Sequence, residues 1–585
     1  MNKLTFLTTL ALLVFSGSLF SQNFSLVNAS QNQVELQHTL DEFKEVHTTI
    51  QGKSYQAFSK TTQVVMMEEG KPALPLYSQA VLLPNNGEVN FSVEHDGFYE
   101  IENIWVAPSK GNLKRNVNPE TIPHTFAAVY QEDAFFPGQL GEISEPFILR
   151  NTRGTVVTLF PYQYNPVTKT LRVYENMRVV VHTDASKQGE NELSTSVISP
   201  EKDAFSRFYH SLYINMPISS KNYPILDEAG EMLVIAADEY LDAIAPLVEW
   251  KIKKGINTTI VPVSEAGATS QQIKSFIQNY YAAHPQLVYI LLVGDADKIP
   301  AHTYGYEYGE ERWSDSYYGQ LVGNGLDFFP EAFVGRFSGN ADEIAVMVER
   351  TIEYEQNPMQ GDWMTKGIGV ASNEGAGYGN NGLSDFQHLR NIRYQFLDYD
   401  FDYLFEFYEG SQGEEDAPGN PTTSMLNNAI NQGIGLFNYT GHGWTHGMST
   451  GDYTNSDVFA ATNNGMYPFV ISVACNNGTF VGETCLAEAM LNATHNGSPS
   501  GAIAAAGSSI LMSWAPPMQT QVEMTNLITR MYENNHKETL GGLFYNSQMS
   551  VLVNYANSAV AREVMQTWVF FGDPSVTYRY RATQD

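Results

Sequence analysis

The sequence predicts an all-β domain followed by a larger α/β domain with a mostly parallel sheet. Three observations support this prediction: short alternating apolar and polar runs in the first third, near-continuous apolar strands later, and helical spacing between those strands. The chain of 585 residues is long enough for several hydrophobic cores. We assign residues 22–222 to the β-rich domain and 223–580 to the α/β domain, which we divide at about residue 360 into two subdomains.

The β-rich domain is predicted from period-two alternation broken by prolines, without a long helical stretch. Its clearest strand-like runs are Ala80–Leu83, Glu88–Val93, Thr155–Phe160 and Leu171–Tyr174. The pattern changes after about Leu226.

The α/β pattern begins with a strand-like run at Glu231–Ala236. Apolar residues at helical spacing follow, with Pro246 as an expected kink and Gly255 as the expected end of the helix. Further apolar runs are typical of strands buried on both faces by helices. These runs are Thr258–Val261, Leu287–Val293, Gly367–Ala371, Gly435–Tyr439, Phe469–Ala474 and Ala502–Ala506.

The N-terminus has the pattern of a secretory signal peptide, which we place at residues 1–21. Lys3 precedes an apolar run from Leu4 to Phe15, and small residues follow. This run is too short to span a membrane, and no later segment is long enough either. We therefore predict a secreted or cell-surface protein without a transmembrane segment.

The charge and cysteine counts exclude several classes of protein. With 33 Lys and Arg against 64 Asp and Glu, the net charge is −31, which argues against a nucleic-acid partner. Two cysteines cannot build a disulfide-dense scaffold or a multi-cysteine zinc module.

Two chemically active side chains follow predicted strands, at the end of the sheet where parallel strands place ligands. His442 lies between Gly441 and Gly443 after one strand, and Cys475 follows another. An imidazole beside a thiol can lower the pKa of the thiol and later protonate a leaving amine. This pattern predicts nucleophilic catalysis, although a buried structural thiol and an ordinary loop histidine are the alternatives for each residue alone.

Cys485 is the competing partner of Cys475. It stands near the start of a predicted helix, and a Cys475–Cys485 disulfide would silence the nucleophile. The zinc-protease motif H-E-x-x-H does not occur in the sequence.

At these residues the chain resembles the gingipain family of secreted cysteine peptidases. The matching segments are Gly335–Ser338, Ala371–Gly375, Ser384–His388, Asn438–Gly443, Val473–Gly478, Ser513–Met518 and Phe571–Ser575, with Gly70–Pro75 and Pro161–Pro166 in a region like the family's propeptide. The resemblance implies a caspase-like α/β catalytic domain preceded by an all-β propeptide domain.

The resemblance also implies the roles of the catalytic residues. Cys475 matches the nucleophile, His442 the general base and acid, and Glu374 the carboxylate that orients the imidazole. The backbone N–H groups of Gly443 and Cys475 match the oxyanion hole. The chemistry requires no cofactor.

By the same resemblance, Asp385 is the expected partner of a basic side chain in the substrate pocket. The other expected lining residues are Thr440, Val473, Trp514 and Met518. Met512 stands where Arg-specific relatives carry a polar amide, and one residue fewer separates Cys475 from Trp514, so the choice between Arg and Lys stays open.

The resemblance further implies a zymogen whose own propeptide is an intramolecular inhibitor, with a protein or peptide as substrate. It places the boundary of the propeptide between Arg207 and Glu231, with Lys221 as a candidate cleavage point. A structural calcium ion is also implied. Its expected ligands are Asp295, the Val322 carbonyl, Asp327 and Glu331. The alternative function is that of a catalytically inactive surface adhesin or binding protein on the same scaffold.

Overall fold

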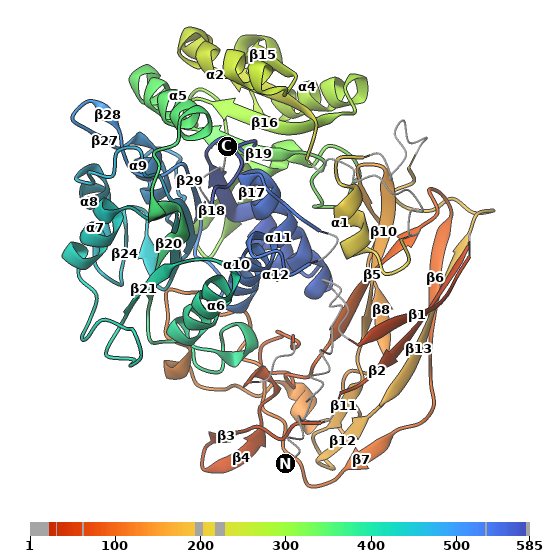
Figure 1. Cartoon of the computed structure of the whole chain (residues 1–585). Helices are drawn as coiled ribbons and strands as arrows, with labels where there is room; N and C mark the ends of the chain where they lie inside the picture. The colour runs from red at the N-terminus through yellow and green to blue at the C-terminus, as the bar shows by residue number, and fades with distance from the viewer. Residues whose placement is uncertain are drawn as a thin grey trace, which may run out of the picture.

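The computed structural model describes residues 23–30, 32–41, 43–60, 64–193, 203–216, 228–532 and 535–580. The predicted signal peptide and the candidate cleavage point Lys221 lie outside these residues. In Figure 1 the β-rich domain, coloured red to yellow, stands beside the α/β domain, coloured green to blue.

The first domain is built from short antiparallel strands, as the alternating pattern predicts. One sheet has the order β1 (Phe24–Ala29), β2 (Gln33–Thr39), β13 (Asn176–Asp184) and β6 (Glu88–His95). A second sheet contains β5 (Tyr77–Leu83), β10 (Thr152–Leu159), β8 (Gly141–Ile143) and β9 (Phe147–Leu149). Smaller pairings join β11 (Tyr162–Asn165), β12 (Thr170–Val173) and β7 (Tyr99–Ile101), and β3 (His47–Ile50) with β4 (Lys53–Gln56). Its one α-helix among the described residues is α1 (Ser206–Leu212).

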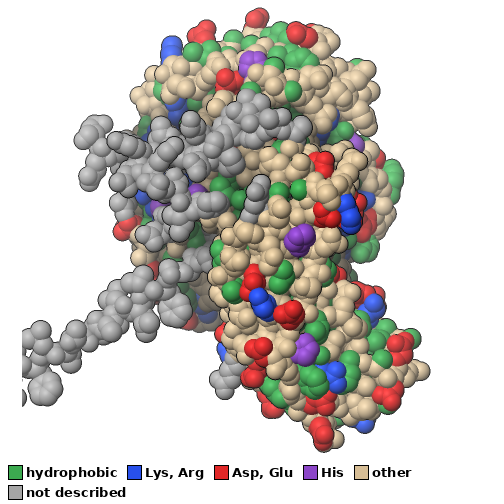
Figure 2. All heavy atoms as spheres, turned by 90° about the vertical axis from the view of Figure 1, so that its right-hand side faces the viewer, with side chains coloured by type: hydrophobic (Ala, Val, Ile, Leu, Met, Phe, Trp, Pro, Cys, Tyr) green, Lys and Arg blue, Asp and Glu red, His purple; other side chains and the backbone are tan. Residues whose placement is uncertain are grey.

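Charged side chains on the outer face of this domain are mixed in sign. Figure 2 shows acidic and basic side chains interspersed over that face, without a continuous basic patch among the described residues.

The α/β domain contains one ten-stranded sheet. The strands lie in the order β15 (Thr258–Pro262), β14 (Glu231–Ala236), β16 (Leu287–Val293), β19 (Phe333–Phe337), β30 (Trp568–Phe571), β29 (Ala504–Ser508), β26 (Phe469–Val473), β22 (Leu436–Thr440), β20 (Lys366–Ala371) and β21 (Tyr403–Tyr408). The six central strands, from β16 to β22 in this order, are buried along their whole length, because helices cover both faces.

The helices of this domain are amphipathic or fully buried segments between the strands. They are α2 (Leu241–Lys254), α3 (Val263–Ala266), α4 (Ser270–Ala283), α5 (Ala341–Gln356), α6 (Asp385–Tyr399), α7 (Thr423–Gln432), α8 (Asn455–Phe459), α9 (Leu486–Asn492), α10 (Ala515–Ile528), α11 (Leu540–Asn554) and α12 (Ala559–Thr567). Gly255 ends α2 with φ 99°, a left-handed conformation that suits glycine, as predicted. Short hairpins add β17 (His302–Glu307) with β18 (Glu310–Ser314), β23 (Gly443–Trp444) with β24 (Gly447–Met448) and β25 (Tyr453–Thr454), and β27 (Thr494–His495) with β28 (Ser498–Pro499).

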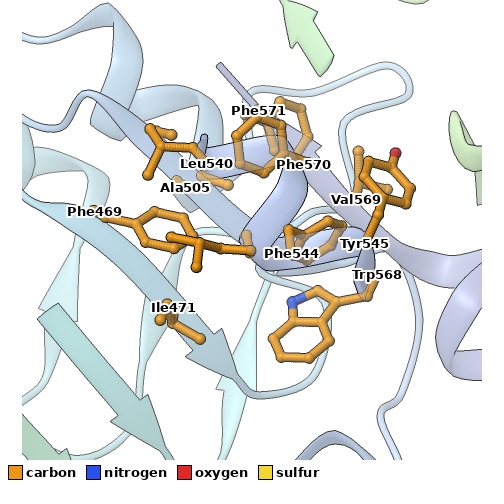
Figure 3. Close-up of a cluster of buried hydrophobic side chains, with 14 of the residues drawn as sticks. Phe469, Ile471, Ala505, Leu540, Phe544, Tyr545, Trp568, Val569, Phe570 and Phe571 are labelled. Carbon is orange, nitrogen blue, oxygen red and sulfur yellow. The ribbon is translucent and has the colours of Figure 1, made fainter. Parts of the chain in front are cut away.

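One junction in the sheet is antiparallel, within the predicted mostly parallel sheet. All neighbouring pairs are parallel except β29 and β30, which are antiparallel. The two strands bury a dense aromatic cluster that includes Phe469, Phe544, Trp568 and Phe570 (Figure 3). Because the halves of the sheet run in opposite directions, the amino ends of β16 and β19 share one edge with the carboxyl ends of β20, β22 and β26.

The β-rich domain is anchored to this shared edge through Arg150, whose side chain is completely buried. Its Nη1 donates to the carbonyls of Leu287 at 2.7 Å and Glu331 at 2.5 Å, and its Nη2 donates to Pro285 at 2.9 Å. Its Nε donates to the carboxylate of Asp203, at 3.0 and 3.1 Å from the two oxygens. Every nitrogen of this guanidinium therefore has a partner.

Candidate active site

Three predicted catalytic residues lie just beyond the carboxyl ends of neighbouring strands. Strands β20, β22 and β26 are in register, with Ala371 opposite Thr440 and Thr440 opposite Val473. Glu374, His442 and Cys475 follow these strand ends, so the parallel sheet gathers them at one edge. His442 Nε2 lies 2.9 Å from a carboxylate oxygen of Glu374.

Cys475 is fully buried, and the Met512 N–H donates to its Sγ at 3.3 Å. Burial raises the pKa of this thiol to about 11, because desolvation disfavours the thiolate, while the Met512 N–H acts in the opposite direction. Gly443 packs against the nucleophile loop: a Cβ there would lie 2.8 Å from the Cys475 carbonyl oxygen. A glycine beside His442 thus has a steric reason.

A segment of the β-rich domain enters this site. We call residues 113–116 the inserted segment. The Arg115 N–H donates to the Met512 carbonyl at 2.7 Å, Lys114 forms an antiparallel bridge with Ser513, and Trp514 Nε1 donates to the Lys114 carbonyl at 3.1 Å. The Arg115 carbonyl contacts Nδ1 of His442. The segment therefore docks on residues 512–514 through backbone contacts. It then turns, since the Val117 N–H donates to the Lys114 carbonyl at 3.2 Å.

The Arg115 side chain fills a buried pocket. Its Nη1 lies 3.1 Å from both carboxylate oxygens of Asp385, and neither side chain is exposed to solvent. The guanidinium also lies over the Trp514 ring, 4.4 Å from the centroid, a favourable cation–π distance. Burial raises the pKa of Asp385, whereas the charge of Arg115 lowers it. The predicted pocket acid and aromatic residue thus meet a basic side chain.

Recognition of Arg115 is incomplete. Its Nε and Nη2 are buried and have no hydrogen-bond partner among the described residues. Met512, which replaces the polar amide expected at this position, contacts the segment through its backbone carbonyl. A thioether is at most a weak acceptor, which explains why its side chain does not satisfy these donors.

The other predicted pocket residues surround a buried polar network. Thr440 Oγ1 donates to Gln521 Oε1 at 2.9 Å, and the same oxygen lies 2.9 Å from His388 Nε2. Burial lowers the pKa of His388 to about 4, so this histidine is neutral. Val473 is the strand neighbour of Thr440, and Met518 lies against the Gly379 loop, where a Cβ would come within 2.8 Å of its methyl group.

Sequence reasoning missed several residues of the site. Ser372 donates to the Asp385 carboxylate at 2.7 Å and accepts from the backbone N–H of Glu374 at 3.2 Å, so it links the Asp385 side chain to the loop that carries Glu374. Glu310, on the β17–β18 hairpin, accepts from Asn476 at 2.8 Å and from the Leu511 N–H at 2.7 Å. A usable signal existed only for the inserted segment, because Lys114-Arg115 is the single Lys-Arg pair in the sequence.

The four expected calcium ligands do not form one site. Asp295 follows the carboxyl end of β16, whereas Glu331 precedes the amino end of the parallel neighbour β19, so roughly 20 Å of strand separates them. Asp327 accepts from the Ile148 N–H at 2.7 Å, and Glu331 accepts from the Val322 N–H at 3.0 Å.

No cluster of three or more His, Cys, Asp or Glu residues suited to a metal occurs in the described part of the chain. The assignment of these four ligands is therefore corrected, and structural calcium stays a prediction without assigned ligands.

Cys485 caps the N-terminus of α9 and is buried and free, as is Cys475, so the structure contains no bridge between them. None of the helices within the described ranges is long and apolar enough to cross a bilayer.

A buried thiol, an imidazole and a carboxylate at adjacent strand ends, with an arginine backbone held across them, define the class of α/β cysteine peptidases. The chain belongs to one family of this class. The family described as peptidase family C25 matches residues 225–579, and the C25 propeptide family matches residues 22–211. The protein is accordingly a cysteine-type endopeptidase with a propeptide domain.

Curated relatives support this assignment along most of the chain. Gingipain R2 of Porphyromonas gingivalis is 35% identical over 564 residues, covering 95% of this chain and 73% of the relative. Gingipain R1 of the same species is 35% identical over 569 residues, but this chain spans only 55% of its length. Lys-gingipain HG66 of Porphyromonas gingivalis is 24% identical over 490 residues, covering 80% of this chain and 27% of the relative.

Solved structures give the same result. The Arg-specific cysteine proteinase gingipain R superposes with a TM-score of 0.56 at 34% identity, covering 63% of this chain and 81% of that chain. The complex of the RgpB pro- and mature domains from Porphyromonas gingivalis has a TM-score of 0.55 at 33% identity, covering 60% of this chain and 80% of that one. The predicted family and fold are confirmed.

Proposed function

We propose that this protein is a secreted endopeptidase that cleaves after basic residues through Cys475 and His442 and is inhibited by its own propeptide. The observation that carries the proposal is the seating of Arg115, with its guanidinium on Asp385 and its carbonyl at His442 Nδ1. A peptide bond that follows a basic residue would occupy the same position. The N-terminal signal pattern supports export.

In the proposed mechanism, the Cys475 thiolate attacks the carbonyl carbon of the basic residue, while His442 holds the proton from the thiol. His442 Nδ1 then protonates the leaving amine as the peptide bond breaks, which leaves a thioester. Water deprotonated by the same imidazole hydrolyses the thioester and restores the thiol. Glu374, 2.9 Å from Nε2, orients the ring and stabilises its charged form.

The N–H groups of Gly443 and Cys475 are the proposed oxyanion donors. The antiparallel pairing of Gly443 on β23 with Met448 on β24 supports Gly443 as an oxyanion donor. The Ser449 N–H donates to the His442 carbonyl, which directs the Gly443 N–H away from β24.

The inserted segment supports the proposal of autoinhibition. Cys475 is fully buried in the zymogen, and this burial raises the pKa of its thiol to about 11, although the charges of Arg115 and Lys114 act in the opposite direction. The thiol is therefore protonated at neutral pH. We expect iodoacetamide to label Cys475 slowly in the zymogen, and faster by about a hundredfold once the propeptide has been removed, because the thiolate fraction rises. A peptide substrate should protect the mature enzyme from labelling.

A panel of fluorogenic peptides that differ only in the residue before the scissile bond tests the specificity. We expect cleavage after Arg and Lys, with Arg preferred because its planar cation stacks on Trp514. A preference for a neutral or acidic residue would overturn the proposal. If Cys475 is inert to labelling in both forms, the alternative of an inactive binding protein gains support.

A further inference from the structure

We propose that the second residue before the scissile bond is also recognised, by Glu563, so that this enzyme selects dibasic Lys-Arg sequences. This inference deepens the proposed function and rests on it, because it uses the inserted segment as a guide to how a substrate binds. Arg115 takes the first position before the scissile bond. Lys114 therefore takes the second.

The Lys114 side chain enters its own buried site. Its Nζ forms an ion pair with Glu563, a residue of α12, and the two side chains are only 4% and 6% exposed. Ser513 Oγ lies 3.5 Å from this ammonium, and the Tyr308 ring centroid lies 4.9 Å from it. A carboxylate, a hydroxyl and an aromatic face thus converge on one cation, which is a complete set of partners for an ammonium group.

This pocket uses different parts of the fold from the Arg115 pocket. Ser513 donates to Glu563 at 3.2 Å, so the strand-like residue that pairs with the Lys114 backbone also orients the carboxylate. Tyr308 lies at the turn of the β17–β18 hairpin. The backbone contacts of residues 512–514 therefore place two neighbouring pockets beside two successive side chains of a bound peptide.

Glu563 forms an ion pair with Lys114 alone among the described residues. In the part of the chain that the structure describes, Lys114 is the one Lys or Arg within ion-pair distance of Glu563. Burying a carboxylate without a cation is costly. When the propeptide leaves, Glu563 loses this partner, and a substrate with Lys at the second position would replace it.

A second acidic residue near Glu563 also favours a cation in this pocket. Glu307 on β17 adds negative potential, although it is itself paired with Arg312 at 3.1 Å. Burial raises the pKa of Glu563, and Lys114 lowers it. An acidic side chain at the second position of a substrate would therefore be repelled, and a neutral one would leave the carboxylate unpaired.

The test uses the full chain, expressed as the zymogen and activated by proteolysis, with peptides ending in Lys-Arg, Ala-Arg and Glu-Arg before the fluorophore. We expect kcat/KM for Lys-Arg to exceed that for Ala-Arg by ten- to a hundredfold, on the order of a charge-assisted hydrogen bond, and Glu-Arg to be the slowest. Rates equal within about twofold for Lys-Arg and Ala-Arg would overturn the inference.

Glu563→Gln keeps the shape of the pocket and removes its charge, so the Lys-Arg to Ala-Arg ratio should fall to within about threefold of one. Glu239→Gln is the control, because Glu239 pairs with Lys298 at 2.8 Å after the carboxyl end of β14, on the opposite edge of the sheet. An unchanged ratio in Glu563→Gln would overturn the inference as well.

A double variant, Lys114→Glu with Glu563→Lys, guards against a folding defect, since it keeps an ion pair in the zymogen. After activation it should prefer Glu-Arg to Lys-Arg, and a retained preference for Lys-Arg would count against Glu563. Failure of this inference is distinguishable from failure of the proposed function. If peptides are cleaved after Arg regardless of the preceding residue, only the role of Glu563 is lost, whereas no cleavage after any basic residue removes both.

Discussion

Two arginines of the propeptide domain are buried against the catalytic domain, and they are held in opposite ways. Arg150 has a partner at every guanidinium nitrogen, three of them backbone carbonyls of the catalytic domain. Arg115 uses Nη1 alone, and its other nitrogens are buried without a partner. Unmet buried donors carry a free-energy cost. The comparison indicates that Arg150 is a lasting structural anchor, whereas Arg115 occupies a pocket made for an exchangeable side chain.

The largest expected effect is on stability and tests the anchor. Arg150→Met should lower the free energy of unfolding of the zymogen by about 3–5 kcal/mol, because Asp203 and the three carbonyls are left buried without their cation. Denaturant titration measures this loss. Arg115→Met is the matched comparison. It should lower the free energy of unfolding by about 1 kcal/mol or less, because the inserted segment can move away and let water reach Asp385. Equal losses in the two variants would contradict the distinction.

The next effect concerns the pocket. Asp385→Asn should reduce kcat/KM for peptides with Arg before the scissile bond by about a hundredfold or more, because it removes one partner of a buried charged pair. Steady-state kinetics on the activated enzyme gives this number. The pKa of Cys475 in the mature enzyme, read from the pH dependence of labelling, serves as the control and should not move. A loss smaller than fivefold would show that Asp385 does not bind the substrate cation.

A smaller effect is expected when the side chain of Arg115 is removed from the pocket. In Arg115→Ala the zymogen should stay folded, but labelling of Cys475 by iodoacetamide should speed up by about tenfold or more, because the segment covers the thiol less tightly. Labelling as slow as in the unmodified zymogen would mean that the backbone pairing alone holds the segment.

The smallest effect is a pH dependence at the anchor. Burial raises the pKa of Glu331 to about 7, with Lys274 opposing the shift, while Asp327 and Arg150 lie beside it. A raised pKa in the folded state means stability that is complete below about pH 4.5 and is lost as the pH rises through about 7.

Denaturant titrations at pH 5 and pH 8 should therefore show a fall of about 1–2 kcal/mol that is reduced in Glu331→Gln. Glu239→Gln, a surface change, should leave the fall intact. If the zymogen were more stable at pH 8 than at pH 5, and if Glu331→Gln left this difference in the free energy of unfolding unchanged, Glu331 would not be the source of the pH dependence.

Much of the fold could be predicted because its signals are local. The run Leu287–Val293 is apolar at every position and forms β16 at those residues, and Gly255 ends α2 where expected. The antiparallel join of β29 and β30 could not be predicted, since strand direction depends on pairing between residues more than 60 positions apart, such as Ala505 and Phe571.

The candidate site divides in the same way. Glu374, His442 and Cys475 could be proposed because each follows an apolar strand and matches a family motif. Thr440 was placed correctly at a strand end, but its partner Gln521 is 81 residues away and carries no local signal. The predicted set of calcium ligands was wrong because Asp295 and Glu331 lie at opposite ends of neighbouring strands. Their spacing in the sequence does not reveal this relation.

The sequence by itself determined the class of each domain and the order of the strands along the chain, and it singled out Cys475 and His442 as candidates for the nucleophile and its imidazole partner. These follow from hydrophobic periodicity and from residues adjacent in sequence. Only the tertiary structure decided that Lys114 and Arg115 lie in the active site, since Arg115 meets Asp385 across 270 residues. The physical reason is the antiparallel pairing of β29 with β30. It brings the amino ends of β16 and β19, where Arg150 binds, to the same end of the sheet as the carboxyl ends of β20, β22 and β26, so one propeptide domain reaches both.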